Sequence, residues 1–115
     1  MDITERLHAN SPSEWHSWLE EHAAIKKEIW LVFYTKATGK QGLSYAEAVE
    51  EALCFGWVDG QSKGIDAETY ALRFTPRRPR SSWTLANRSL ARRLIEEGRM
   101  SALGLRVLPT DNTAT

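Results

Sequence analysis

The strongest chemical signal in the chain is a stretch of closely spaced arginines between two tryptophans. Its members are Trp57, Arg73, Arg77, Arg78, Arg80 and Trp83. A guanidinium group binds carboxylate and phosphate through paired, planar hydrogen bonds, and an indole stacks on a ligand ring or on a guanidinium. This pattern predicts a pocket for an anionic group. The structural alternative is that Arg73 or Arg77 pairs with Asp59 to hold a hairpin, while the remaining arginines face solvent.

Asp59 is the best candidate for a general acid or base. Partial burial raises the pKa of a carboxyl group toward neutrality, as acid–base catalysis at neutral pH requires. However, Asp59 precedes Gly60, and Asp-Gly is also a common turn sequence. We therefore favour a structural role for Asp59 and keep catalysis as an alternative.

The remaining reactive residue types favour no other kind of site. Cys54 lies between two apolar residues, late in a predicted helix, which indicates a buried thiol rather than a nucleophile. His16 and His22 share a predicted helix but are six positions apart, which is not the spacing that puts two metal ligands on one face. We expect no catalytic residue, no metal and no cofactor.

A sharp junction between a helix and a hairpin must position these side chains. Gly56 and Gly60 bracket the first tryptophan of the stretch, and glycine permits the backbone conformations that such a junction needs. Residues 58–65 and 69–75 then have the composition and alternation of two strands joined by a short turn. The alternation places Arg73 on the opposite face from its apolar neighbours.

Three helices are predicted from their start signals and their apolar stripes. Ser11 and Ser44 are each followed three positions later by Glu, which is the capping-box pattern, and the last helix begins near 82–84 and ends at Gly98. The predicted stripes consist of Trp15, Trp18, Leu19 and His22; of Tyr45, Val49, Ala52 and Leu53; and of Trp83, Ala86, Leu90 and Leu94.

The element order predicts an α+β fold with a small mixed sheet of about three strands. Residues 28–36 are nearly continuously apolar and rich in β-branched and aromatic side chains, so we expect a central strand covered on both faces. The predicted order is helix, strand, helix, strand, strand, helix. We expect one domain over 1–108, with another helical turn or two at 101–108, and a disordered tail at 109–115.

Composition indicates an ordinary globular domain. The chain has 115 residues, of which 42% are apolar and 26% are charged. Its longest apolar run, 29–34, is far shorter than a membrane-spanning helix, so we expect no membrane insertion. The acidic start has no secretion-signal pattern, and one cysteine agrees with a reducing compartment, so we expect a cytoplasmic protein.

Positive and negative charges are unevenly distributed along the chain. Residues 1–60 contain 10 acids and 5 bases, while residues 61–115 contain 5 acids and 10 bases, so charges of −5 and +5 cancel. This polarity indicates either an anion-binding face or two halves that pack with complementary surfaces. Arg88, Arg92 and Arg93 on the last helix also suggest a nucleic-acid interface, but a pI near 6.8 makes this the weaker alternative.

Three sequence blocks resemble the bacterial YdeI/OmpD-associated family, often labelled bacteriocin-protection proteins. The blocks are ALCFGWVDG, RFTPRRPRSSW with Asn87 after it, and LIEEGRMSALGL, and the likeness covers roughly residues 12–106. The resemblance implies a link to stress or bacteriocin resistance, without a settled reaction or cofactor. Members of that family usually continue past the GRM block into a basic helical segment. The resemblance does not cover that segment, so it implies no role that depends on it.

Together these patterns predict a small binding module rather than an enzyme. The expected partner is an anionic small molecule or an acidic protein surface, and the sequence indicates no oligomeric state. The resemblance also implies a shared cluster that includes Pro76 and Gly60. The predicted ligand-binding residues are Trp57, Asp59, Arg73, Arg77, Arg78, Trp83 and Asn87.

Overall fold

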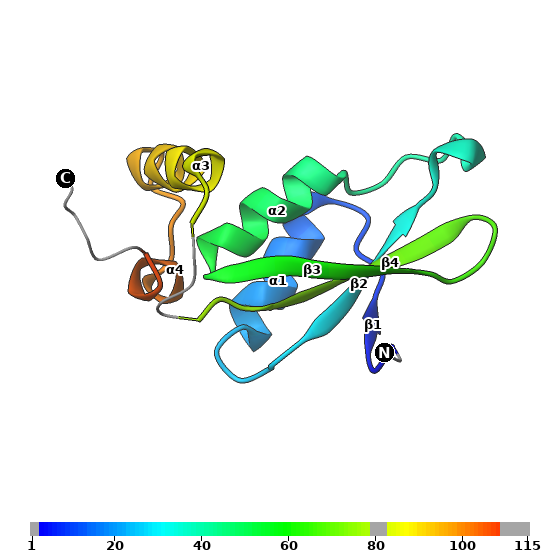
Figure 1. Cartoon of the computed structure of the whole chain (residues 1–115), viewed down its shortest axis with the longest axis horizontal. Coiled ribbons are helices and arrows are strands. Elements are labelled where there is room, and N and C mark those ends of the chain that lie inside the picture. The colour runs from blue at the N-terminus through cyan, green and yellow to red at the C-terminus, as the bar shows by residue number, and fades with distance from the viewer. Residues whose placement is uncertain (1–2, 79–82, 109–115) are drawn as a thin grey trace.

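A computed structural model of the chain, which describes residues 3–78 and 83–108, shows an α+β fold, as predicted (Figure 1). One mixed sheet is packed by helices. The elements in chain order are β1 (Arg6–Leu7), α1 (Pro12–His22), β2 (Ile29–Tyr34), the 3-10 helix η1 (Lys36–Thr38), α2 (Tyr45–Cys54), β3 (Trp57–Gly64), β4 (Thr69–Pro76), α3 (Leu85–Glu96) and α4 (Ala102–Arg106).

The sheet has four strands in the order β1-β2-β4-β3, one more than expected. The extra strand, β1, is only two residues long and pairs in parallel with β2, so that Leu7 lies opposite Leu31. The other pairs are antiparallel, and β3 with β4 forms the predicted hairpin. A two-residue strand has no periodicity of its own, which explains why the sequence did not indicate it.

The hydrophobic core lies between α1, α2 and one face of the sheet. Trp15 and Leu19 from α1 and Ala52 from α2 are fully buried against strand residues of β2 and β4. On the opposite face, Trp30 and its neighbours in the sheet are also buried. The central strand β2 is thus covered on both faces, as its continuous apolar sequence predicted.

Both predicted N-caps are confirmed. The Ser44 hydroxyl accepts a hydrogen bond from the Glu47 N–H, and the Glu47 carboxylate accepts one from the Ser44 N–H. The Ser11 hydroxyl caps α1 in the same way, but the Glu14 carboxylate accepts its bond from the Asn10 N–H instead. These bonds satisfy N–H groups that the first helical turn leaves without partners.

Two predicted apolar stripes are only partly right. Tyr45, expected to be buried, is 53% exposed, and Ala48 lies in the core of α2 instead. In α3, Ala86 is exposed, whereas Ala91 and Leu94 are buried. The last helix starts after its cap, Thr84; the predicted start at residue 82 and the predicted tail at 109–115 lie outside the described residues.

The β3–β4 hairpin contains a bulge at its centre. Asp59 lies opposite Phe74, and Ser62 lies opposite Leu72. Between these two pairs β3 therefore has one residue more than β4. The extra residue falls at Gly60 and Gln61, and a bulge of this kind bends the strand and re-aims its side chains. Asp59 lies before the bulge, and because it pairs directly with Phe74 it lies on the same face of the sheet, where α2 packs.

Candidate functional site

The turn after α2 and the end of β4 meet at one point in the structure. Gly56 has a φ of 75°, a conformation that glycine adopts without strain. Its carbonyl accepts a hydrogen bond from the Arg77 N–H at 2.7 Å, and Trp57 lies opposite Pro76 in the sheet. The turn that contains Gly56 and Trp57 and the segment Pro76–Arg77 therefore lie side by side.

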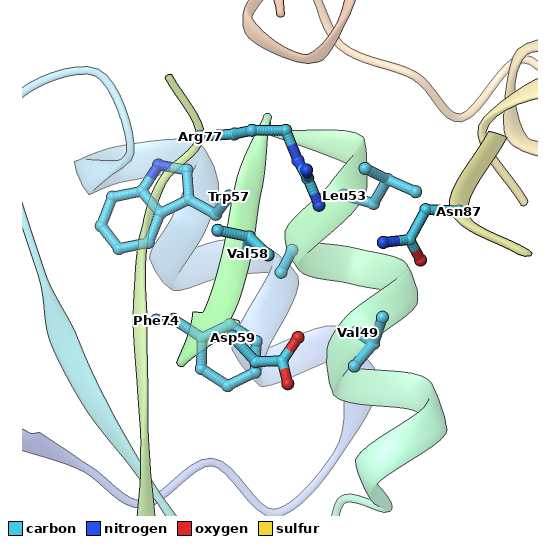
Figure 2. A pocket seen from close by; sticks show the side chains of 9 residues that line it. Val49, Leu53, Trp57, Val58, Asp59, Phe74, Arg77 and Asn87 are labelled. Atoms are coloured by element: carbon cyan, nitrogen blue, oxygen red, sulfur yellow. The ribbon is translucent and has the colours of Figure 1, made fainter. Parts of the chain in front are cut away.

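A small hollow lies where these segments meet α2 and α3, and Figure 2 shows its lining. The lining residues are Val49, Ala52, Leu53, Trp57, Val58, Asp59, Phe74, Arg77 and Asn87. Four of the predicted site residues are among them. The cavity volume is about 10 Å³, which is room for about one water molecule. A whole metabolite does not fit inside it.

Arg77 is a buried polar residue at the wall of this hollow, and only 8% of it is exposed. Its guanidinium lies 4.3 Å from the centre of the Trp83 ring, in a cation–π contact. Burial lowers the pKa of Arg77, and the charge of Asp59 only partly opposes that effect. An anion near this group would therefore offset part of the cost of burying its charge.

The Asp59 carboxylate is held by a tyrosine hydroxyl. From the first turn of α2, Tyr45 donates a hydrogen bond to Asp59 Oδ2 at 2.9 Å. Burial, followed by the bond to Asp59 and the charge of Asp59, raises the pKa of Tyr45. The sequence did not indicate this contact of Tyr45, which holds Asp59 without itself lining the hollow. Its place in an apparent apolar stripe concealed a polar contact.

The two predicted tryptophans have different roles. Trp57 is 2% exposed, and its indole N–H donates to the Ala23 carbonyl at 3.3 Å, so this ring is part of the core. The indole nitrogen of Trp83 is buried and has no hydrogen-bond partner among residues 3–78 and 83–108. The side-chain amide of Asn87 faces the hollow and makes no hydrogen bond to the described part of the chain (Figure 2).

Arg73 is not brought to the hollow. Its Nε donates to the Glu28 carboxylate at 2.6 Å on the opposite face of the sheet, in register with Trp30. Hydrogen bonds from Thr4 and then from Arg73 lower the pKa of Glu28. Arg78 is exposed next to Arg77. The remaining predicted arginine, Arg80, lies outside the described residues.

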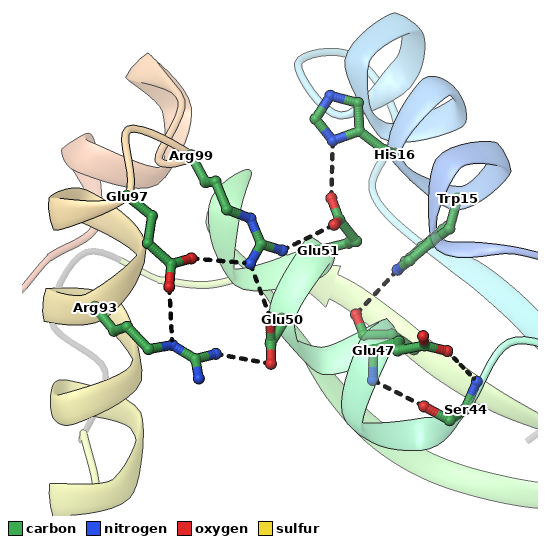
Figure 3. Close-up of polar contacts among 10 residues, drawn as sticks. Trp15, His16, Ser44, Glu47, Glu50, Glu51, Arg93, Glu97 and Arg99 are labelled. Carbon is green, nitrogen blue, oxygen red and sulfur yellow. Dashed lines mark hydrogen bonds and ion pairs between the residues drawn. The ribbon is translucent and has the colours of Figure 1, made fainter.

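A second group of arginines is occupied by carboxylates of α2 (Figure 3). Arg99 binds Glu50 at 3.0 Å and Glu51 at 2.9 Å, and Arg93 binds Glu50 at 2.8 Å. Burial works against the charge of Arg99, but its bonds to Glu50 and Glu97 outweigh that effect and raise its pKa. Together with Arg73, these arginines of the second half are thus paired with acids of the first half.

The structure places Cys54 in the core and His16 beside a carboxylate. Cys54 is fully buried, and burial, with the nearby charge of Glu51, raises its pKa to about 11, so the thiol stays protonated at neutral pH. His16 binds Glu51 at 2.8 Å. Across residues 3–78 and 83–108, no group of three or more His, Cys, Asp or Glu side chains is placed to hold a metal ion.

Comparison with known proteins identifies the family. A family model described as a domain of unknown function, DUF8412, matches residues 7–107. The chain belongs to the DUF8412 family. No curated protein and no solved structure gives a significant match. Within the described ranges, the DUF8412 chain has no helix long and apolar enough to cross a membrane.

Proposed function

We propose that this DUF8412 chain is a non-catalytic binding module that recognises a carboxylate or phosphate group at the mouth of the hollow between β3, β4 and α3. One observation carries the proposal: the Arg77 guanidinium is 8% exposed and lies against Trp83 beside that hollow. A buried guanidinium held by an aromatic ring is a preorganised partner for a planar anion.

The neighbouring groups suit that role. The Asn87 amide faces the hollow as a further donor, and exposed Arg78 adds positive charge beside it. Because the hollow has room for about one water molecule, an anionic group would bind at its mouth and not inside it. This supports a small anion or an acidic side chain of a partner protein. The likeness to YdeI/OmpD-associated proteins supports a role in stress or bacteriocin resistance in the cytoplasm.

Ligand-induced stabilisation tests the proposal. The unfolding temperature is measured with acetate or inorganic phosphate, against sodium chloride of the same ionic strength. A ligand that binds only the folded state adds about 2.7 kcal/mol at 100 times its Kd. We expect stabilisation of the wild type and its loss in Arg77→Gln and in Asn87→Ala.

The matched control is Arg92→Gln, which removes one exposed positive charge from α3 away from the hollow. Each variant is compared with itself without ligand, so any loss of basal stability in Arg77→Gln cancels. Equal stabilisation of all three variants by the anions would refute the proposal. Binding of a single-stranded oligonucleotide whose affinity falls steeply with salt would favour the nucleic-acid alternative.

A further inference from the structure

A second, wider pocket lies at the other end of α2, where the chain passes from β2 through η1 to the start of that helix (Figure 1). Its volume is about 440 Å³, within the range of small-molecule sites. The lining residues are Phe33, Tyr34, Lys36, Lys40, Gln41, Gly42, Leu43, Ser44, Tyr45 and Tyr70. None of them lines the hollow at Arg77.

Aromatic rings form the apolar part of this pocket. Phe33 and Tyr70 lie opposite each other in β2 and β4, and their rings stack with centroids 5.4 Å apart and planes 16° apart. Phe33 is 4% exposed, while Tyr70 is half-buried and Tyr45 is 53% exposed. Such a surface offers ring faces and edges to a flat ligand, because aromatic pairs prefer offset or edge-to-face contact.

The charged part of the lining is purely positive. Lys36 and Lys40 line the pocket, and no Asp or Glu does. Lys40 Nζ lies 5.4 Å from the centre of the Tyr34 ring and binds Glu68 at 3.2 Å, outside the lining. The Lys36 side chain is exposed and makes no hydrogen bond or ion pair within the described ranges. An anionic substituent would find at least one lysine that is not already paired.

We propose that this pocket binds a planar aromatic ring that carries a carboxylate or a phosphate. The ring lies against Tyr70 and Tyr45, and the anionic group meets Lys36. The hydroxyl of Tyr70 and the amide of Gln41 supply further polar contacts at the edge of the ring. This site is separate from the one proposed at Arg77, and its ligand differs because a ring fits inside this pocket, whereas the hollow at Arg77 has room for about one water molecule.

Amide chemical shifts of the full chain, measured by NMR during titration with benzoate and with phenyl phosphate, test the inference. We expect saturable shifts at residues 33–45 and at Tyr70. Benzamide, which lacks the charge, and cyclohexanecarboxylate, which lacks the flat ring, should each bind about three- to tenfold more weakly. The two anionic probes distinguish a carboxylate site from a phosphate site.

Lys36→Gln should weaken benzoate or phenyl phosphate binding about fivefold, the effect of one nearby cation in water. Lys27→Gln, which removes another exposed lysine, outside the pocket, should leave binding unchanged. Gln41→Trp should block the pocket, and Arg77→Gln should leave the dependence on Lys36 intact. Shifts that stay absent at residues 33–45, or equal affinities of the Lys36 and Lys27 variants, would overturn the inference.

Discussion

Arg73 and Arg77 are four residues apart, yet they lie in different environments. β4 ends at Pro76, so strand alternation directs Arg73 toward Glu28 but no longer governs Arg77. Arg77 turns back over the Gly56 carbonyl and packs against Trp83. An arginine count along the sequence therefore overstates the charge available at one site, because only part of the set reaches the hollow.

Cys54 should make the fold sensitive to alkaline pH. Its pKa in the folded chain is about 11, above the ordinary value of 9.0, so the folded state keeps the thiol proton where the unfolded state loses it. The protonated thiol therefore contributes its full stabilisation below pH 9. The free energy of unfolding falls by about 2 to 3 kcal/mol as the pH rises from 9 to 11. Urea unfolding followed by tryptophan fluorescence across this range measures it.

Cys54→Ala is the comparison for that experiment, since it removes the thiol and leaves the raised pKa of Tyr45 in place. We expect the wild type to lose more stability than the variant between pH 9 and pH 11. Parallel curves for the two proteins would show that the thiol titrates at its ordinary pKa.

At the scale of elements, the short helix α4 is docked by its backbone. Gly104 lies so close to the end of α2 that an added Cβ would be 2.4 Å from the Cys54 carbonyl oxygen and from the Met100 sulfur. The same carbonyl accepts hydrogen bonds from the Ser101 N–H at 2.9 Å and from its hydroxyl at 2.6 Å. Only glycine permits this approach, so residue 104 determines whether α4 can stay in place.

Gly104→Ala should therefore destabilise the chain by about 1 to 3 kcal/mol, the usual cost of overpacking. Gly64→Ala is the matched control, because nothing lies within 4 Å of an added Cβ there and its φ is not in the positive range. Alanine in a strand is favoured over glycine by about 0.5 to 1 kcal/mol, so the control should be neutral or stabilising. Denaturant unfolding of both variants checks the contrast, and equal changes would contradict the docking argument.

The elements that the sequence predicted best are those with local signals. Ser11, Ser44 and Gly56 mark boundaries through their own hydrogen bonds or backbone conformation, and the structure places boundaries there. β1 depends on a partner more than twenty residues away, so no local pattern marks it. The pairing of Arg73 with Glu28, and the contact of Tyr45 with Asp59, also depend on tertiary register and were not predictable from spacing.

At the scale of the whole molecule, three arginines of the second half pair with acids of the first half. Glu28 pairs with Arg73, and the acids of α2 pair with Arg93 and Arg99. This is the complementary packing that the −5 and +5 halves suggested as one of two explanations.

Acid should weaken the fold through these same pairs. Burial acts to raise the pKa of Glu50, but hydrogen bonds from Arg93 and Arg99 outweigh it, and the net pKa is lowered from 4.5. The pKa of Glu28 is lowered as well. A carboxyl group whose pKa is lower in the folded than in the unfolded state stabilises the fold at pH values above the unfolded-state pKa. This stabilisation is lost as the pH falls below about 4.5.

Arg99→Met tests the acid response, with exposed Arg92→Met as the control for loss of one positive charge. At neutral pH the first variant should lose about 1 kcal/mol more than the second, because three carboxylates lose a partner. It should also lose less stability on acidification. Identical acid profiles of both variants would show that the Arg99 pairs do not contribute.

The bulge in β3 has a consequence for encounters between molecules. β3 is one of the two edge strands of the sheet, and an edge strand with free backbone groups is a template on which aggregation and amyloid-like stacking can begin. The extra residue between Asp59 and Ser62 bends this edge strand, and the charged residue Lys63 follows the bend. A strand arriving from another copy would meet a bent and charged border, which disfavours growth of the sheet in that direction.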